Sequence, residues 1–305
     1  MDGILPLWKD RGMTSHDCVS KLRKILHTKK IGHSGTLDPD VDGVLPICIG
    51  KGTKVVEFLV DSGKEYEGEI TLGYATTTED ASGEIVRQDP INEPFSTEEI
   101  DEAMQKFVGE MTQVPPLYSA VKVNGKRLYE YARSGQPVER PQRKVQIKSF
   151  TRTSSPVYQK EQQTQSWRFK VACGKGVYVR TLAVDLGKEL GVSAHMSDLT
   201  RVKSAGFTKE QAVTLEEVRA AAEKDQVSEI LLPIEYGVQA FQRVDISEQL
   251  WQKIRNGARL PYSAFGLVDM PTEAIAVFYQ NQVVSLYEAN KNEKNGLKPL
   301  KVLKN

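Results

Sequence analysis

The sequence predicts a folded protein that combines helices with half-buried strands, and three observations support this prediction. Hydrophobic residues make up 39% of the 305 residues and charged residues 27%, which is ordinary globular usage. Some stretches place apolar residues at helical spacing behind a capping residue, whereas others alternate apolar and polar residues with the period of a strand. At about 150 residues per domain, the length predicts two domains.

Three helices are predicted from capping signals that precede an apolar stripe. The first begins at Thr14, which stands three residues before Asp17 in the spacing of a capping box, and it ends at Leu26. The same spacing of a hydroxyl residue and an acidic residue starts helices at Ser96 and Thr214. Each of these segments then carries apolar residues three or four positions apart, which is typical of a helix with one buried face.

Strands are predicted where apolar and polar residues alternate. Residues 66–74 and 167–173 show this alternation clearly. After a turn with two glycines, the alternation resumes over residues 177–180, ahead of a helix that ends at a glycine. Tyr178 and Arg180 are two positions apart and are therefore expected on the same face of that strand.

The segment 31–50 is predicted to be a shaped loop, because four glycines and two prolines interrupt any periodicity. Within it, Pro39 biases the preceding Asp38 away from helical geometry, and the nearby glycines permit sharp turns. The loop is therefore expected to present the Asp38 carboxylate at a fixed point. On spacing alone, an aspartate that caps a turn explains the same pattern.

Several other chemistries lack their motifs. The three cysteines form no C-x-x-C pair and the four histidines lack metal-ligand spacing, so no metal centre is predicted. Residues 38–49 begin like a calcium-binding loop, but Ile49 stands where a bidentate glutamate is required. No apolar stretch approaches the roughly 18 residues that span a bilayer, and a cytoplasmic protein is expected.

The charge is unevenly distributed, although 41 Lys and Arg residues nearly cancel 40 Asp and Glu residues. Residues 113–152 carry nine basic and two acidic side chains, and residues 1–33 and 291–305 each have an excess of four basic residues. Residues 77–102 carry nine acidic side chains and one basic. Separate basic surfaces of this kind can bind phosphates, although a solvated charged face is the alternative. The long connection 115–142 is a candidate binding arm.

A domain boundary is predicted after the segment 231–237. Residues 1–240 would then form one domain and residues 241–305 a small C-terminal module. The module is predicted to contain a short helix over residues 247–257 and two short strands within residues 274–287.

Eight short motifs carry the functional signal. They are residues 12–17 (GMTSHD), 32–39 (GHSGTLDP), 43–50 (GVLPICIG), 64–66 (KEY), 114–122 (VPPLYSAVK), 176–181 (GVYVRT), 199–201 (LTR) and 204–207 (SAGF). Together they resemble the bacterial tRNA pseudouridine synthase B family, which isomerises uridine 55 in the T loop of tRNA. The motifs follow the order of the family across residues 4–235.

The resemblance implies an α+β fold with a mixed, largely antiparallel sheet flanked by helices, and the strand alternations agree with it. Residues 1–240 would form the catalytic domain, with residues 113–152 as a basic arm that clamps tRNA. Residues 241–305 would form a β-rich, PUA-like RNA-binding module. The implied activity needs no cofactor or metal, and it is expected from a monomer that binds the T stem-loop of tRNA without a membrane or an obligate protein partner.

The resemblance also assigns residues to roles in the reaction. Asp38 would be the catalytic nucleophile or base, Arg180 would pair with it, and Tyr66 would stack on the target base. Because a nucleophilic carboxylate must be ionised and burial raises its pKa, a guanidinium beside it favours the active form. The further substrate-binding residues implied are His33, Tyr178, Leu199, Lys9 and Lys122.

Two departures from the family pattern affect the support of the active loop. Asp10 follows Lys9 where the family usually has proline, and Gly52 stands where alanine is common. Two other functions stay open at this point. One is a tRNA-binding and refolding protein that acts through the basic arm, and the other is a related synthase that acts on another RNA.

Overall fold

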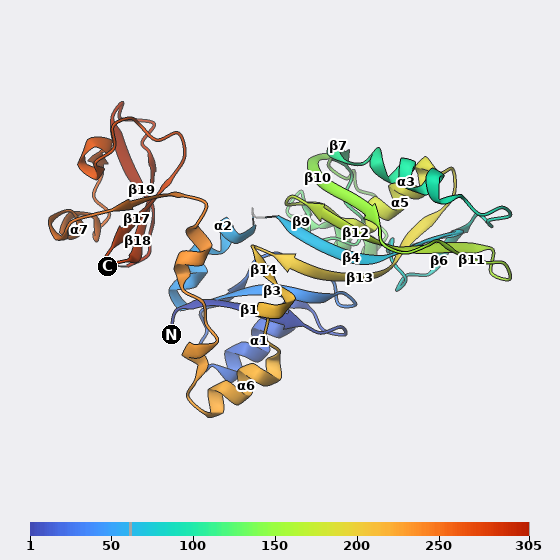
Figure 1. Cartoon of the computed structure of the whole chain (residues 1–305), viewed down its shortest axis with the longest axis horizontal. Coiled ribbons are helices and arrows are strands. Elements are labelled where there is room, and N and C mark those ends of the chain that lie inside the picture. Colours follow the sequence, from blue (N-terminus) through green and yellow to red (C-terminus); the bar gives the residue numbers. More distant parts are fainter. Residues whose placement is uncertain (61–62, 305) are drawn as a thin grey trace.

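The structure, a computed structural model, describes residues 1–60 and 63–304 and contains a large mixed sheet and a smaller C-terminal sheet (Figure 1). The path of the large sheet is β1 (Gly3–Lys9), β3 (Asp42–Ile49), β13 (Ala194–Ser204), β4 (Lys64–Leu72), β12 (Thr164–Cys173), β10 (Arg143–Arg152) and β7 (Gly109–Gln113). Three short strands extend it: β2 (Ile31–His33) beside β3, β11 (Val157–Gln159) beside β12 and β14 (Phe207–Thr208) beside β13. Among these pairs only β3 and β13 are parallel, which confirms the predicted mixed, largely antiparallel sheet.

The two halves of this sheet meet at a short seam between β3 and β13. Two residue pairs join the strands there, Thr200 with Asp42 and Arg201 with Gly43. A Cβ atom on Gly43 would lie 2.2 Å from the carbonyl oxygen of Arg201, and Gly43 has a φ of +127°. Only glycine therefore permits this approach. The loop that carries Asp38 leads directly into the seam.

Helices flank both halves of the sheet (Figure 1). The α-helices are α1 (Ser15–Ile25), α2 (Val56–Val60), α3 (Thr97–Gln105), α4 (Leu128–Ser134), α5 (Val179–Glu189), α6 (Leu215–Glu223) and α7 (Glu248–Ile254). The 3₁₀ helices are η1 (Gly50–Val55), η2 (Lys209–Gln211), η3 (Val227–Glu229), η4 (Ile234–Val238) and η5 (Tyr262–Phe265). The predicted capping boxes at Thr14, Ser96 and Thr214 are present, so the three helix starts are confirmed. Over the described residues, no helix is long and apolar enough to cross a membrane.

The prediction of a loop over residues 31–50 is wrong at both ends, because β2 and β3 lie inside this segment. β3 is buried almost along its whole length, so its apolar residues show no alternation. Its Pro46 is paired with Pro6 of β1. The carbonyls of the two prolines accept hydrogen bonds on their outer sides, from the N–H groups of Ser34 and Val213. The two strands therefore exchange no hydrogen bond at this pair, and the missing N–H groups do not interrupt the ladder.

The predicted strand over residues 177–180 is also wrong, because α5 begins at Val179. Tyr178 is the residue that precedes the helix, with φ −103° and ψ 107°, and Arg180 lies in the first helical turn. The two side chains therefore do not share a strand face. The apolar residues continue at helical spacing to Leu182 and Leu186, both buried, and this longer pattern decides the local structure.

The C-terminal module is built on a five-stranded sheet. Its order is β15 (Gln242–Asp245), β17 (Ile275–Tyr279), β18 (Gln282–Ala289), β19 (Gly296–Val302) and β16 (Leu260–Pro261). The predicted helix and the two strands are confirmed as α7, β17 and β18, whereas the other strands were not predicted. A hydrophobic cluster that includes Val55 and Ala276 joins the module to the rest of the chain. The exact domain boundary at residue 240 stays a prediction.

The candidate arm has secondary structure of its own. The hairpin of β8 (Lys122–Val123) and β9 (Lys126–Arg127) is followed directly by α4. A second small hairpin, β5 (Tyr74–Thr76) and β6 (Ile85–Gln88), lies within the acidic segment 77–102 and just before it. The loop of this second hairpin contacts β13, where Asp80 bridges to Met196.

The tight approach at the seam predicts a large stability difference between two glycine substitutions. Gly43→Ala should lower the free energy of unfolding by about 3 kcal/mol or more, since both strain and overlap oppose it. Gly206 also has a positive φ, +82°, but no heavy atom within 4 Å of a Cβ, so Gly206→Ala should cost about 1 to 2 kcal/mol. Urea unfolding of both variants measures the difference. Equal losses would show that the seam does not require the glycine.

Candidate active site

A cleft surrounds the Asp38 carboxylate. Two adjoining pockets of about 590 and 510 Å³ are both lined by Asp38, Arg180 and Leu199. Tyr118 and Tyr129 of the arm also line both pockets. The cleft thus lies between the loop before β3, the strand β13, the start of α5 and the arm. Its volume is large enough to receive a nucleotide-sized ligand.

The backbone on each side of Asp38 is held by buried polar groups. The hydroxyl of Ser15, which is 1% exposed, accepts a hydrogen bond from the Leu37 N–H at 2.9 Å and donates to the Leu37 carbonyl at 3.2 Å. On the other side, the Pro39 carbonyl accepts from the Gly12 N–H at 2.9 Å and from Lys9 Nζ at 3.1 Å. These contacts fix the residues that flank Asp38, so the direction of its side chain is set before a ligand arrives.

Arg180 is the basic partner of Asp38. Its Nε lies 3.1 Å from Asp38 Oδ2, and the Arg180 side chain is 7% exposed. Nη1 donates to the Thr78 carbonyl at 2.8 Å and lies 3.4 Å from Asp80 Oδ2, while Nη2 donates to the Tyr118 carbonyl at 3.1 Å. A buried guanidinium with acceptors on each of its nitrogens is fixed in position.

The Asp38 side chain combines an open face with a poorly hydrated setting. It keeps 44% of its surface exposed toward the cleft. Burial by the surrounding protein raises the pKa of Asp38, the positive charge of Arg180 opposes this rise, and the negative charge of Asp80 adds to it. The ionised carboxylate therefore depends on Arg180, and it can still be reached by a ligand.

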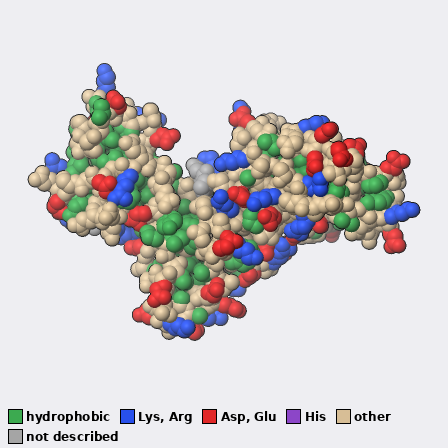
Figure 2. Space-filling view, viewed as in Figure 1, with side chains coloured by type: hydrophobic (Ala, Val, Ile, Leu, Met, Phe, Trp, Pro, Cys, Tyr) green, Lys and Arg blue, Asp and Glu red, His purple; other side chains and the backbone are tan. Residues whose placement is uncertain are grey.

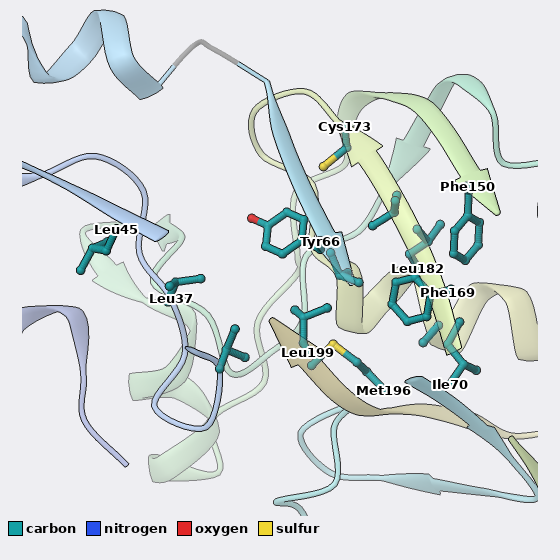
Figure 3. Packing of buried hydrophobic residues seen from close by; sticks show 14 of the residues in the cluster. Leu37, Leu45, Tyr66, Ile70, Phe150, Phe169, Cys173, Leu182, Met196 and Leu199 are labelled. Carbon is teal, nitrogen blue, oxygen red and sulfur yellow. The ribbon is translucent and has the colours of Figure 1, made fainter. Parts of the chain in front are cut away.

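Tyr66 and Leu199 come from the neighbouring strands β4 and β13 and line the part of the cleft beside Asp38. Tyr66 is 7% exposed and Leu199 is 6% exposed. Figure 3 shows these two residues on adjacent strands, with Leu37 on the segment across from them. Burial raises the pKa of Tyr66, so its hydroxyl stays protonated. The ring and the leucine side chain offer apolar surface to a planar ligand.

Arg201 of β13 is a buried cation that belongs to the LTR motif but was given no role in the sequence analysis. It has no exposed surface, and its Nε donates to the Val44 carbonyl at 2.8 Å while Nη2 donates to the Gly35 carbonyl at 3.0 Å. It therefore ties the strand that carries Leu199 to the segment that carries Asp38. Thr78, Asp80 and Tyr118 were also missed, because two of them act through backbone carbonyls that no side-chain pattern reveals.

Of the predicted substrate-binding residues, Tyr178 lines the cleft and His33 does not. Tyr178 lines the pocket next to Asp38, where the Gln113 side chain holds its backbone: Gln113 Oε1 accepts from the Tyr178 N–H and Nε2 donates to its carbonyl. His33 lies on β2, is paired with Ile47, and is not among the residues that line the two pockets. Its Nδ1 is buried without a hydrogen-bond partner in the described chain. The role predicted for His33 stays a prediction.

Lys9 does not fit the direct substrate contact that was predicted for it. The side chain has no exposed surface, and Nζ donates to three backbone carbonyls, those of Asp10, Met13 and Pro39. Burial lowers the pKa of Lys9, and the nearby carboxylates oppose that shift. All three donors of the ammonium are used within the fold. Lys9 therefore supports the loop of Asp38.

The arm presents cations at its tip and uses others to hold its base. Lys122, Lys126 and Arg127 are exposed, and none of them forms a salt bridge within the described residues. At the base, Arg140 lies 3.8 Å from Glu79 and Arg152 pairs with Asp101 at 2.9 Å. The basic and acidic segments of the sequence thus partly neutralise each other, and Figure 2 shows both charges interspersed on the viewed face.

Aromatic rings and cations also alternate where the arm meets the cleft. The guanidinium groups of Arg127 and Arg133 lie over the ring of Tyr129, at 5.8 and 5.3 Å from its centre. Tyr129 itself lines both pockets. Rings and guanidinium groups in this arrangement can stack with nucleobases and attract phosphates.

The arrangement suits acid–base or nucleophilic chemistry on a planar ligand. The Asp38 carboxylate is reachable and is held beside a guanidinium, and apolar and aromatic side chains line the adjoining surface. No group of three or more histidine, cysteine, aspartate or glutamate side chains that could hold a metal ion was found over residues 1–60 and 63–304.

Family models match most of the chain. Residues 23–179 match the model described as TruB family pseudouridylate synthase (N terminal domain), and residues 180–239 match the one described as tRNA pseudouridylate synthase B C-terminal domain. The chain is 51% identical to tRNA pseudouridine synthase B of Lactiplantibacillus plantarum, covering 99% of this chain and 98% of that protein. It is 53% identical to the protein of the same name from Streptococcus agalactiae, covering 99% of each.

Solved structures give the same fold. The structure of a Cbf5-Nop10-Gar1 complex contains a chain that is 27% identical, with a TM-score of 0.74, and the match covers 99% of this chain and 84% of that chain. A chain of an H/ACA RNP bound to a substrate RNA is similar, with a TM-score of 0.72, 24% identity and coverage of 99% and 85%.

The electrostatics of the cleft predict the titration of Asp38. The Asp38 pKa should lie above the ordinary aspartate value, and Arg180→Met should raise it further, because the neutral side chain no longer favours the carboxylate. Carbon-detected NMR titration of the carboxyl groups measures this. Asp17 is the internal control: hydrogen bonds from Thr14 lower its pKa, and that value should be the same in both proteins. An unchanged or lower Asp38 pKa in the variant would contradict the assigned pairing.

Proposed function

This chain belongs to the TruB family of pseudouridine synthases, and we propose that it isomerises uridine 55 in the T loop of tRNA to pseudouridine. The observation that supports the proposal most directly is the Asp38 carboxylate, which is open to the cleft and paired with a buried guanidinium. The curated relatives named tRNA pseudouridine synthase B are about half identical to this chain, and the match covers nearly their whole length.

The reaction is a rearrangement within one nucleotide. The bond between N1 of uracil and C1′ of ribose breaks, the base turns, and a new bond forms between C5 and C1′. The proton lost from C5 is balanced by the proton gained at N1, so no atom is gained or lost overall. The protein must therefore supply a nucleophile or base, a surface that holds the detached ring, and protection from water.

Asp38 is proposed as that nucleophile or base. Attack at C1′, addition at C6 and removal of a ribose proton all require the ionised carboxylate, and Arg180 favours this form against the effect of burial. The fixed loop aims the carboxylate, since Leu37 and Pro39 are both held by hydrogen bonds. A nucleophile that is positioned in advance needs little reorganisation during the reaction.

The target base must leave its stack before it can reach Asp38. Extrusion costs on the order of a few kcal/mol, and stacking on an aromatic side chain returns about 1 to 3 kcal/mol per base. We assign this stacking to Tyr66, with Leu199 and Tyr178 completing the pocket. The three residues come from β4, β13 and the residue before α5, so the pocket is formed by rigid elements.

The arm and the C-terminal module are proposed to bind the rest of the tRNA. Exposed cations at the arm tip can contact phosphates, and Tyr129 with its two guanidinium neighbours lies between the tip and the cleft. We expect the protein to act in the cytoplasm as a monomer, with no obligate protein partner and no cofactor. The β-rich form of the module agrees with the PUA-like assignment.

Replacing the proposed nucleophile separates chemistry from binding. Asp38→Asn should abolish pseudouridine formation on an unmodified tRNA transcript while tRNA affinity changes by less than about threefold, because the amide keeps the shape and loses the charge. Asp185→Asn, in α5 where the carboxylate pairs with Lys188 and lines neither pocket, is the matched control and should keep full activity. Turnover by Asp38→Asn would reject the assignment. Tests of tRNA folding with the inactive variant would reveal a separate refolding function.

The position of the modified nucleotide tests the substrate. Sequencing after chemical labelling of pseudouridine should give a single signal at position 55 of the transcript. A transcript with cytidine at position 55 should give none, since only the uracil ring can be rejoined through C5 to yield pseudouridine. A signal elsewhere in tRNA, or modification of other RNAs with equal efficiency, would favour the related synthase of different specificity.

The arm makes a separate prediction about binding. Lys122→Ala should weaken tRNA binding and reduce the slope of log affinity against log salt by about one, because one phosphate contact is lost. Lys106→Ala, at the residue that follows α3, is the control and should leave the slope unchanged, because this lysine is paired with Glu189. Filter binding across a series of salt concentrations measures both. An unaltered slope for Lys122→Ala would place this side of the arm outside the RNA interface.

A further inference from the structure

Arg11 spans the seam of the sheet beside the active cleft. It lies in the turn between β1 and α1 and lines the same pocket as Asp38. Its Nη2 lies 2.6 Å from Asp198 Oδ1 on β13 and 3.3 Å from Asp42 Oδ1 at the start of β3. One guanidinium thus joins carboxylates from the two halves of the sheet.

Further hydrogen bonds make this a connected cluster. Thr200 Oγ1 donates to Asp42 Oδ1 at 2.6 Å, and Arg11 Nη2 also lies 3.4 Å from the Leu199 carbonyl. The second oxygen of Asp198 accepts from Arg168 at 3.1 Å. The cluster covers the place where two backbone pairs join β3 to β13, so side chains reinforce a short stretch of ladder.

The separation across this seam determines the geometry of the reaction. Asp38 lies four residues before Asp42 and moves with the first half of the sheet. Leu199 follows Asp198 and moves with the second half, together with the base-stacking surface of β4. A relative displacement of the halves would therefore move the carboxylate away from the base, and an error of about 1 Å in such a position can cost about a hundredfold in rate.

We propose that Arg11 is a positioning residue, which braces the two halves of the sheet so that the carboxylate at position 38 meets the extruded base at the correct distance. This inference rests on the proposed function and names a residue that supports it from outside the reacting groups. Both contacts are made by one nitrogen, because Nη2 lies between the two carboxylates. The rigid guanidinium plane holds that nitrogen in place, whereas the ammonium of a lysine is a point charge on a flexible stem.

Binding of a tRNA phosphate is the competing role for Arg11. The side chain is 48% exposed, but its charge lies between Asp42 and Asp198, and Arg168 pairs with the other oxygen of Asp198, so the cluster carries no net positive charge. A phosphate would have to displace one of these carboxylates or accept their repulsion. The positioning role therefore agrees better with the contacts that are present.

The exposure of the ion pairs also predicts which property will change. Half-exposed ion pairs contribute little to folding stability, typically below about 1 kcal/mol. Loss of Arg11 should therefore leave the fold intact and alter the rate of the chemical step. A residue with a merely structural role would lower the melting temperature without a specific effect on that rate.

The test measures the single-turnover rate with enzyme in excess over tRNA, together with the dissociation constant. Arg11→Gln should reduce the rate about tenfold or more while the dissociation constant changes by less than about threefold. Arg11→Lys should recover part of the rate, since it restores one ionic contact. Arg87→Gln is the matched control and should retain the wild-type rate. It removes an exposed arginine of β6 that is paired with Asp89.

A double-mutant cycle with Asp198→Asn isolates the brace. Each rate is expressed as a fraction of the wild-type rate. If the two residues act together, the fraction for the double variant should exceed the product of the fractions for the two single variants by about fivefold or more. Independent, fully multiplying effects would overturn the proposal. So would a rise in the dissociation constant with an unchanged rate and a weaker salt dependence, which would identify a phosphate contact. Wild-type protein without activity would instead reject the proposed function itself.

Discussion

The buried guanidinium of Arg180 is the interaction on which the candidate site depends. It contacts the carboxylate of Asp38, the loop of Thr78 and Asp80, and the arm at Tyr118. An unpaired guanidinium in this setting would be costly, so these segments must adopt positions that satisfy it. The same contacts orient the carboxylate and form one wall of the cleft between the sheet and the arm. Chemistry and local folding are therefore coupled through one side chain.

The sequence predicted the elements whose pattern is local. The alternation in β4 and β12 and the capping boxes of α1, α3 and α6 lie within a few residues and need no knowledge of neighbours. β3 was missed because burial on both faces removes the alternation, and because Pro46 was interpreted as a loop signal. The start of α5 was missed because the strand pattern over four residues was too short to exclude a helix.

The site shows the same division between local and tertiary information. Motifs singled out Asp38, Tyr66 and Arg180, and the structure places all three around one cleft. The contacts that hold them could not be predicted, because they end on backbone carbonyls or come from distant segments. Lys9 shows this clearly: the family resemblance implied a substrate contact, but only the fold reveals that its ammonium contacts carbonyls instead of a ligand.

The two departures from the family pattern have physical explanations in the fold. At position 10, Lys9 contacts the backbone carbonyl of Asp10. A proline would offer the same carbonyl, so the change to aspartate preserves this contact, which supports the active loop. At position 52 a Cβ atom would lie 2.4 Å from the carbonyl of Gly3, and that carbonyl cannot move freely because β1 is paired with β3 along its length. Gly3 is itself confined, since its own Cβ would meet the Leu232 carbonyl at 2.9 Å. The glycine at position 52 is therefore required by the close packing of this chain's first strand, and it acts on that packing and not on the reacting groups.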